Sequence, residues 1–169
     1  MKMTAIQLEP PVKEEKKSLV ELVCGIIPQE GRILTLWNKS KARYELPGGK
    51  KIDDEDYKFC IMRELDEELK LSYKEKEIDE INGYIELVNQ IPINKCINSK
   101  YHEEIIPLLF LLRLKDGFKV SPRLGSGYSE VRWMDIMSEE FKRYNLSELT
   151  RYVCDGLFEG KLELPRKKI

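Results

Sequence analysis

The stretch "LPGGKKIDDEDYKFCIMRELDEELKL", residues 46–71, carries an acidic residue at nearly every second or third position after a pair of glycines. From Asp54 to about Leu69 it contains no glycine or proline, and Asp53 or Asp54 is suited to cap a first helical turn. The stretch therefore predicts a helix of about four turns that follows a tight, exposed glycine loop.

Three of these acidic residues are predicted to share one face of the helix. Spacings of three and four residues return to the same side, so Glu64, Glu67 and Glu68 fall within an arc of roughly 100°. The apolar residues Ile61, Met62, Leu65 and Leu69 fall on another arc that can pack on a sheet. Like charges this close repel one another, and Mg²⁺ would offset that repulsion because it prefers carboxylates, water and phosphates. The alternative is an ordinary solvated helix face.

The spacing around the helix resembles the Nudix box. Gly49 is followed by Glu55 and then by "RELDEELKL" from Arg63, which matches glycine, glutamate, Arg-Glu, an aliphatic residue, any residue, Glu-Glu, any residue, glycine and an aliphatic residue. Every position agrees except Lys70, which stands where the pattern has its last glycine. A glycine just past a helix accepts the left-handed conformation that ends it, so we expect strain at Lys70 and a helix that runs further or ends less sharply.

The fold class predicted is α/β. Strands interleaved with two helical regions indicate a domain with a mixed sheet, and the resemblance implies a Nudix-type α/β/α sandwich around that mixed β-sheet. We expect an N-terminal arm at residues 1–17, the Nudix hydrolase domain at 18–160 and a C-terminal tail at 161–169.

The remaining elements follow from apolar runs and turn residues. We expect a β-hairpin from residues 18–27 and 32–38, then a polar loop at 39–49. Pro107 suggests an early or edge position for the apolar strand around it. Near the C-terminus, two helical segments are expected to meet near Asn145, with Ser138 as a cap. The other strands are expected within residues 77–91, 105–114 and 128–136.

Site roles come from the matching positions of the box. The resemblance implies that Glu64, Glu67 and Glu68 are catalytic metal ligands for Mg²⁺ or Mn²⁺. It also implies that the Gly49 carbonyl completes the coordination shell and that Glu55 supports the metal through water. Arg63 is expected to be the ion-pair partner of Glu55 and to hold the loop against the helix.

Further site residues are expected outside the box. Glu103, Glu104 and Glu130 are candidates for a general base, and Glu130 is favoured because it leads into the strand "VRWM"; a solvated loop acid is the alternative. Arg43 and Tyr44 are expected to bind substrate. Trp37, Tyr84 and Phe110 could stack a base as well, and core packing is the alternative for every one of these aromatic residues.

The implied function is metal-dependent hydrolysis of a diphosphate linkage in a nucleoside di- or triphosphate derivative, that is, a Nudix-type pyrophosphohydrolase. Nucleoside triphosphates, nucleotide sugars and RNA 5′ ends remain open as substrates, and a homodimer remains open as the assembly. Two alternatives are kept: a non-catalytic nucleotide-sensing Nudix domain, which typically has lost box carboxylates, and an isopentenyl-diphosphate isomerase-like enzyme, which needs a catalytic cysteine and acid.

Composition narrows the partners. The chain has 29 basic and 30 acidic residues in 169, so no overall field draws it to DNA or to an anionic membrane. No apolar run approaches the roughly 20 residues of a membrane span, and the N-terminus lacks the apolar centre of a signal peptide. We expect a cytoplasmic protein.

The cysteines argue against zinc and against disulfides. Cys24, Cys60, Cys96 and Cys154 are too far apart for a CxxC pair, and His102 is the only histidine. We expect reduced, mostly buried thiols, and any metal must then be held by oxygen.

Overall fold

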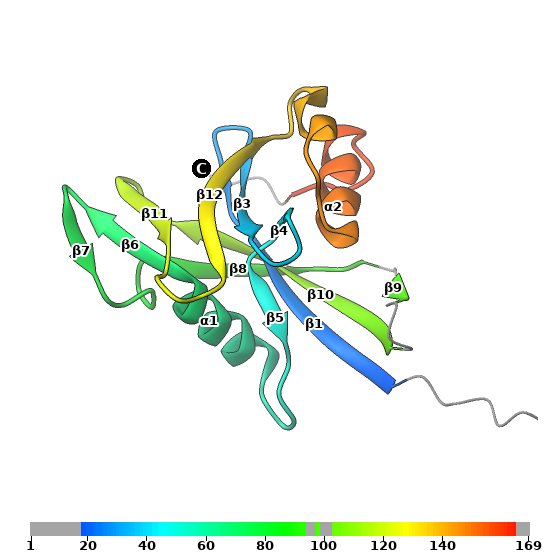
Figure 1. Ribbon diagram of the computed structural model, residues 1–169, viewed down its shortest axis with the longest axis horizontal. Helices are drawn as coiled ribbons and strands as arrows, with labels where there is room; N and C mark the ends of the chain where they lie inside the picture. The colour runs from blue at the N-terminus through cyan, green and yellow to red at the C-terminus, as the bar shows by residue number, and fades with distance from the viewer. Residues whose placement is uncertain (1–17, 94–96, 99–102, 165–169) are drawn as a thin grey trace, which may run out of the picture.

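The computed structural model describes residues 18–93, 97–98 and 103–164, and Figure 1 shows the arrangement of its elements. None of the helices in these ranges is long and apolar enough to pass through a membrane. The strands are β1 (Ser18–Ile26), β2 (Pro28–Gln29), β3 (Arg32–Asn38), β4 (Arg43–Glu45), β5 (Gly48–Lys50), β6 (Leu69–Tyr73), β7 (Lys76–Ile78), β8 (Ile85–Ile91), β9 (Ile97–Asn98), β10 (Glu103–Leu114), β11 (Phe118–Pro122) and β12 (Tyr128–Asp135). The helices are α1 (Tyr57–Glu68), the 3₁₀ helix η1 (Glu139–Arg143) and α2 (Glu148–Phe158).

The central sheet has the order β5-β1-β10-β8, and β9 also pairs with β10. Strands β1 and β10 run parallel along the whole of β1, whereas the other pairs in this sheet are antiparallel. The second half of β1, Leu22–Ile26, and residues 105–112 of β10 carry no charged side chain, as expected for strand segments covered on both faces. The predicted mixed sheet is confirmed.

Two smaller sheets flank the central one. Strand β3 lies between β12 and β2 and also pairs with β4, while β6 lies between β11 and β7. These sheets carry the turns that approach the C-terminal end of α1, namely the β3–β4 turn and the β11–β12 loop.

The two helices lie on opposite sides of the strands (Figure 1). Side chains alternate along a strand, so Val23 of β1 packs in a core with Ile61 and Leu65 of α1, whereas Cys24 packs in a second core with Val153 of α2. The predicted α/β/α sandwich is therefore confirmed.

The predicted hairpin is wrong in its first strand. β1 does not pair with β3; it pairs with β10 and β5, and the hairpin consists of the short β2 and β3, with Pro28 opposite Ile33. A strand that is apolar on both faces is better buried in the central sheet than in a two-stranded ribbon. The expected polar loop at residues 39–49 also contains two strands, β4 and β5.

Helix α1 begins later than predicted. Its cap is Asp56, whose side chain accepts the Lys58 N–H at 2.8 Å, and neither Asp53 nor Asp54 caps it. Asp54 has a φ of 61°, and the Glu55 N–H donates to the Ile52 carbonyl, so these residues form a turn before the helix. The acidic run is thus divided between a loop and a helix.

Pro107 lies in a central strand and not at a sheet edge. Residues 104 and 105 of β10 pair with β9, and pairing with β8 starts at Leu109. Pro107 falls between these two segments, so its missing N–H removes no described ladder bond on that side. At the C-terminus, Ser138 and Ser147 cap η1 and α2, which confirms two helical segments.

The expectation of strain at Lys70 is wrong. The helix ends at Glu68 and Leu69 is already extended, with φ −114° and ψ 147°, so the chain passes directly into β6. Lys70 pairs with Ser121 of β11, and its Nζ lies 3.0 Å from a carboxylate oxygen of Glu77. A strand replaces the usual turn after the helix, and no left-handed residue is needed.

We therefore expect Lys70→Gly to lower the free energy of unfolding by about 1 kcal/mol, because glycine weakens a strand interior. Urea denaturation measures this change. Lys70→Gln is the matched control: it loses the exposed ion pair but keeps a strand side chain, so its effect should stay within about 0.5 kcal/mol. A gain in stability for the glycine variant would show that the lysine is strained after all.

Candidate active site

The three box glutamates project from the last two turns of α1. Ile61 and Leu65 bury the neighbouring arc of this helix, so the glutamates run from the edge of the buried face out to solvent, on the arc that the spacing predicted. Their environments differ: Glu68 is 6% exposed, whereas the side chains of Glu64 and Glu67 are 14% and 58% exposed. The solvent exposure of the carboxylates therefore increases from Glu68 to Glu64 to Glu67.

The glycine pair before the helix lies directly against two of these carboxylates. The Gly48 N–H donates to Glu68 Oε2 at 3.0 Å. Gly48 has a φ of 145°, and a Cβ there would lie 2.1 Å from the Val23 carbonyl oxygen. A Cβ on Gly49 would lie 2.4 Å from the Glu64 carboxylate. Position 48 thus needs glycine, whereas a side chain at position 49 would displace the Glu64 carboxylate.

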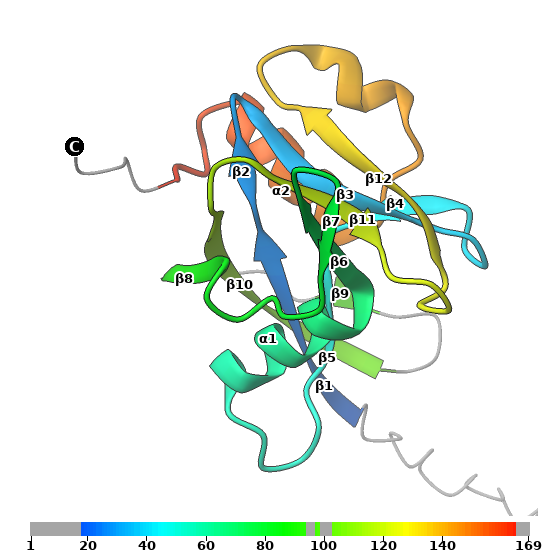
Figure 2. The ribbon, with the colours of Figure 1, turned by 90° about the vertical axis from the view of Figure 1, so that its left-hand side faces the viewer.

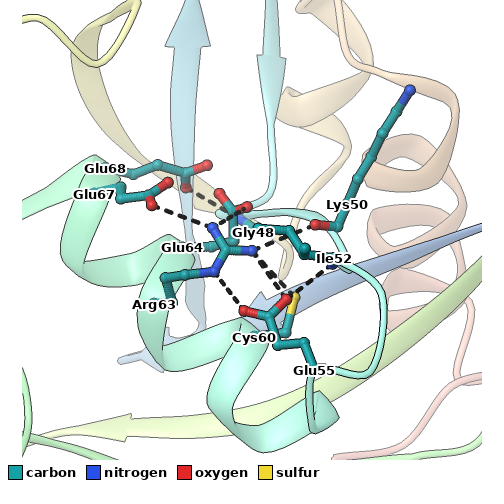
Figure 3. Close-up of polar contacts among 9 residues, drawn as sticks. All are labelled: Gly48, Lys50, Ile52, Glu55, Cys60, Arg63, Glu64, Glu67 and Glu68. Atoms are coloured by element: carbon teal, nitrogen blue, oxygen red, sulfur yellow. Dashed lines mark hydrogen bonds and ion pairs between the residues drawn. The ribbon is translucent and has the colours of Figure 1, made fainter.

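Arg63 connects the loop to the helix (Figure 3). Its Nε and Nη2 donate to the two carboxylate oxygens of Glu55 at 2.5 and 3.1 Å. Its Nη1 donates to Glu64 at 3.0 Å and to Glu67 at 3.2 Å. The ion pair predicted between Arg63 and Glu55 is present, and the contacts with Glu64 and Glu67 were not foreseen.

The charges of the site are unevenly compensated. The hydrogen bond from Arg63 lowers the pKa of Glu55 to about 2. Burial raises the pKa of Glu64 and, more strongly, that of Glu68, and the neighbouring glutamates add to this effect. Within the described ranges Glu68 has no ion pair, so its charge is the least well compensated of the three.

The chemistry of these donors fits a hard divalent cation. Among the described residues, no three His, Cys, Asp or Glu side chains are grouped so as to hold a metal as they stand. The available donors are nevertheless carboxylate oxygens and a backbone carbonyl, which suit Mg²⁺ or Mn²⁺. Glycine at position 49 lets the backbone and the Glu64 carboxylate lie close together, so both kinds of oxygen donor occur in one place.

A polar cleft of about 550 Å³ opens beside the glutamates. It is lined by Glu64, Glu67 and Glu68 from α1, by Asn38, Lys39 and Ser40 from the β3–β4 turn, and by Gly125, Ser126, Gly127 and Tyr128 from the β11–β12 loop. The Lys39 N–H donates to the Gly127 carbonyl at 3.2 Å, which joins the β3–β4 turn to the β11–β12 loop. These two segments lie side by side in Figure 2. The cleft is thus bounded by the helix on one side and by two connected turns on the other.

The wall opposite the helix was not predicted from the sequence. Asn38 Oδ1 accepts the N–H groups of Ser40 and Lys41, both at 3.1 Å, and its amide donates to Glu45. Asparagine in such a turn and the "GSG" motif before the last strand were the available signals. Neither indicated that the two turns meet.

Tyr128 is the aromatic residue in the cleft lining. Burial, together with the negative charge of Glu68 nearby, raises its pKa, so the side chain stays a neutral phenol. The aromatic residues considered from the sequence lie elsewhere. Phe110 is buried in the core, Tyr84 packs on Phe118 at 4.6 Å between ring centroids, and Trp37 packs on Tyr44 at 4.8 Å.

Tyr44 and Glu130 are brought together, but not in the cleft lining. The Tyr44 hydroxyl donates to Glu130 at 3.1 Å, and Arg132 pairs with Glu130 at the same distance. Tyr44 is buried in the core on the α2 side. Its neighbours Arg43 and Glu45, which pair at 3.2 Å, project to the other face of β4 because side chains alternate.

The remaining predicted residues lie apart from the cleft or outside the described ranges. Glu104, near the start of β10, is not in the cleft lining, and the Glu103 side chain and His102 lie outside what the structure describes. Cys24, Cys60 and Cys154 are buried and unpaired, as expected, while Cys96 lies outside the described residues.

No protein-family model matches this chain, and no curated protein sequence matches it. Solved structures do. The MutT protein from Methanosarcina mazei Go1 superimposes with a TM-score of 0.61 at 19% identity, over 88% of this chain and 99% of that one. The MutT Nudix hydrolase from Burkholderia pseudomallei gives 0.59 at 19% identity, over 82% and 97%. A UDP-X diphosphatase gives 0.60 at 14% identity, over 85% and 64%.

The chain therefore has the fold of the Nudix hydrolases. Identities this low establish a shared fold and do not by themselves establish a shared activity. The activity has to be argued from the site.

We expect Gly49→Ala to weaken metal binding by roughly tenfold or more, because its Cβ displaces the Glu64 carboxylate. Calorimetric titration with Mn²⁺ measures the loss. Gly125→Ala is the control for a change in the cleft lining: its φ of 82° strains the backbone, but nothing lies within 4 Å of a Cβ there, so no carboxylate is displaced and Mn²⁺ affinity should hold. Unchanged Mn²⁺ affinity in Gly49→Ala would remove Glu64 from the ligand set.

Proposed function

We propose that this protein is a Mg²⁺- or Mn²⁺-dependent Nudix-type pyrophosphohydrolase that cleaves a diphosphate linkage in a nucleoside di- or triphosphate derivative. The observation that carries the proposal is the meeting of Glu64, Glu67 and Glu68 with the bare glycine loop at one polar cleft. The shared fold with structures described as Nudix hydrolases supports it.

In this proposal Glu64, Glu67, Glu68 and the Gly49 carbonyl hold the metal, and Glu55 supports it through water. When bound, the metal offsets charge on the phosphate oxygens and lowers the pKa of the attacking water. Arg63 keeps the loop and the helix together through Glu55. The protein thus supplies a rigid frame of oxygen donors at the edge of the cleft.

The opposite wall is proposed to hold the substrate. Lys39 lies across the cleft from the glutamates and offers a positive charge to phosphate oxygens that the metal does not cover. Tyr128 offers a ring face and a phenol donor. Arg43, on the same face of β4 as Glu45, stays a candidate for substrate contact. Tyr44 and Glu130 could take part only if substrate also reached the α2 side of β12.

The remaining expectations belong to the same proposal. The hydrolase domain is taken as residues 18–160, and the arm at 1–17 lies outside the described residues, as do residues 165–169 of the tail. The substrate is a small nucleotide derivative, with an RNA 5′ end still included, and DNA and membranes are not partners. A cytoplasmic location and a homodimer remain part of the hypothesis.

The two alternatives make different demands. A sensing domain needs no complete carboxylate set, whereas this chain keeps the box glutamates together at the cleft. An isomerase-like enzyme needs a cysteine at the reacting centre, but Cys24 and Cys60 are buried and do not line the cleft. Both observations favour the hydrolase.

We expect Glu67→Gln and Glu68→Gln each to lower kcat by at least about a hundredfold, equivalent to roughly 2.7 kcal/mol of transition-state stabilisation. Substrate binding should suffer less, because the opposite wall is unchanged. The measurement is turnover of nucleoside triphosphates, nucleotide sugars and capped RNA with Mg²⁺ or Mn²⁺. Glu139→Gln is the control, since Glu139 pairs with Lys142 on η1 and does not line the cleft.

Hydrolysis in water labelled with heavy oxygen should place the label on a phosphate product, because the attack is at phosphorus. Wild-type protein that binds nucleotides but releases no phosphate-containing product from this panel, with either metal, would support the sensing alternative.

We also expect millimolar Mg²⁺ to raise Tm, because a ligand that binds only the folded state stabilises it. In Glu67→Gln the metal-induced increment in Tm should shrink, since one ligand has lost its charge. Differential scanning calorimetry with and without Mg²⁺ gives both increments. An equal increment in the variant would exclude Glu67 as a ligand.

A further inference from the structure

The guanidinium of Arg63 has two different sides. Nε and Nη2 form a bidentate pair with Glu55, whose side chain is 7% exposed and also accepts the Ile52 N–H at 2.9 Å. A planar ion pair with two parallel hydrogen bonds is the strongest geometry that arginine forms with a carboxylate. This side of Arg63 is fixed to the loop.

The other side is held less firmly. A single nitrogen, Nη1, divides its hydrogen bonds between Glu64 at 3.0 Å and Glu67 at 3.2 Å. The Glu67 side chain is more than half exposed, so its contact with Arg63 is screened by water. Figure 3 shows Nη1 directed toward these two carboxylates while the rest of the guanidinium faces Glu55.

The carboxylates that Nη1 contacts are two of the proposed metal ligands. A divalent ion bound to their oxygens at about 2.1 Å would come within a few ångströms of Nη1, and two positive charges at that distance repel each other. The same contacts turn Glu64 and Glu67 toward the guanidinium, whereas Glu68 accepts the Gly48 N–H.

We infer that Arg63 is the internal counter-ion of the metal-free site, and that a divalent cation displaces Nη1 from Glu64 and Glu67 while Nε and Nη2 stay bound to Glu55. This inference rests on the proposed function, since it takes Glu64 and Glu67 as ligands. Arg63 then has two roles: it positions the loop at all times, and it competes with the metal for the helix.

The test compares two variants that share the loss of Glu55. In Glu55→Gln the Arg63 charge remains beside Glu64 and Glu67; in Glu55→Gln/Arg63→Gln it is gone, and the neutral pair can still hydrogen-bond. With Mn²⁺ alone as the probe, we expect the double variant to bind about fivefold more tightly than the single one, because a nearby unit charge no longer opposes the cation. Calorimetry or Mn²⁺ electron paramagnetic resonance gives both values of Kd.

Equal or weaker Mn²⁺ binding by the double variant would overturn the inference, because Arg63 would then organise the ligands and not compete for them. No substrate is present, so this outcome leaves the proposed hydrolysis untouched. Wild-type protein that binds no Mn²⁺ would instead contradict the ligand assignment itself.

A measurement on the wild-type chain avoids any effect of the variants on folding. In nitrogen-15 spectra of the arginine side chains, Mg²⁺ should shift the Nη1 signal of Arg63 and speed its exchange with water, while the Nε–H signal stays protected by Glu55. Arg113, which pairs with Glu86 on β8, is the internal control and should not respond. Loss of protection at both nitrogens, or at neither, would contradict the inference.

Discussion

The candidate site depends on the close contact between helix α1 and the glycine strand β5. The Gly48 N–H donates to the buried Glu68, and a Cβ on Gly49 would lie only 2.4 Å from the Glu64 carboxylate. A side chain at either position would separate the helix from the strand or move a carboxylate. The increase in solvent exposure from Glu68 through Glu64 to Glu67 follows from this contact.

The charge of the acidic cluster is only partly compensated. Burial opposes the charge on Glu68, and the like charges of its neighbours oppose it further. Arg63 compensates the negative charges of Glu64 and Glu67, but Glu68 forms no ion pair among the described residues. This uncompensated charge lowers the stability of the fold, and under the proposed function a bound cation would offset it. Strongly shifted pKa values of this kind are more typical of active sites than of ordinary charged surfaces.

The sequence predicted what depends on local spacing. It placed Glu64, Glu67 and Glu68 on one helix face and indicated a mixed sheet. The resemblance to the Nudix box supplied the pairing of Arg63 with Glu55 and the helical layer on each side of the sheet. It failed where pairing across the chain decides the outcome: β1 joined β10 and not β3, and Lys70 became a strand residue because β11 was available beside it. The cleft wall was missed for the same reason, since nothing local shows that Lys39 meets Gly127.

That last contact has a consequence for how such a site can change over time. The hydrogen bond between Lys39 and Gly127 uses only backbone atoms, whereas the Gly48 N–H donates to the side-chain carboxylate of Glu68. The main chain therefore joins the two turns of the opposite wall, and the Lys39 side chain can change without breaking this bond. Among the described residues, the hydroxyls of Ser40 and Ser126 make only local hydrogen bonds, with Asn38 and with the Tyr128 N–H. Mutation can alter which molecule the opposite wall accepts while the acidic helix keeps its geometry, so that a new preference evolves without rebuilding the chemistry.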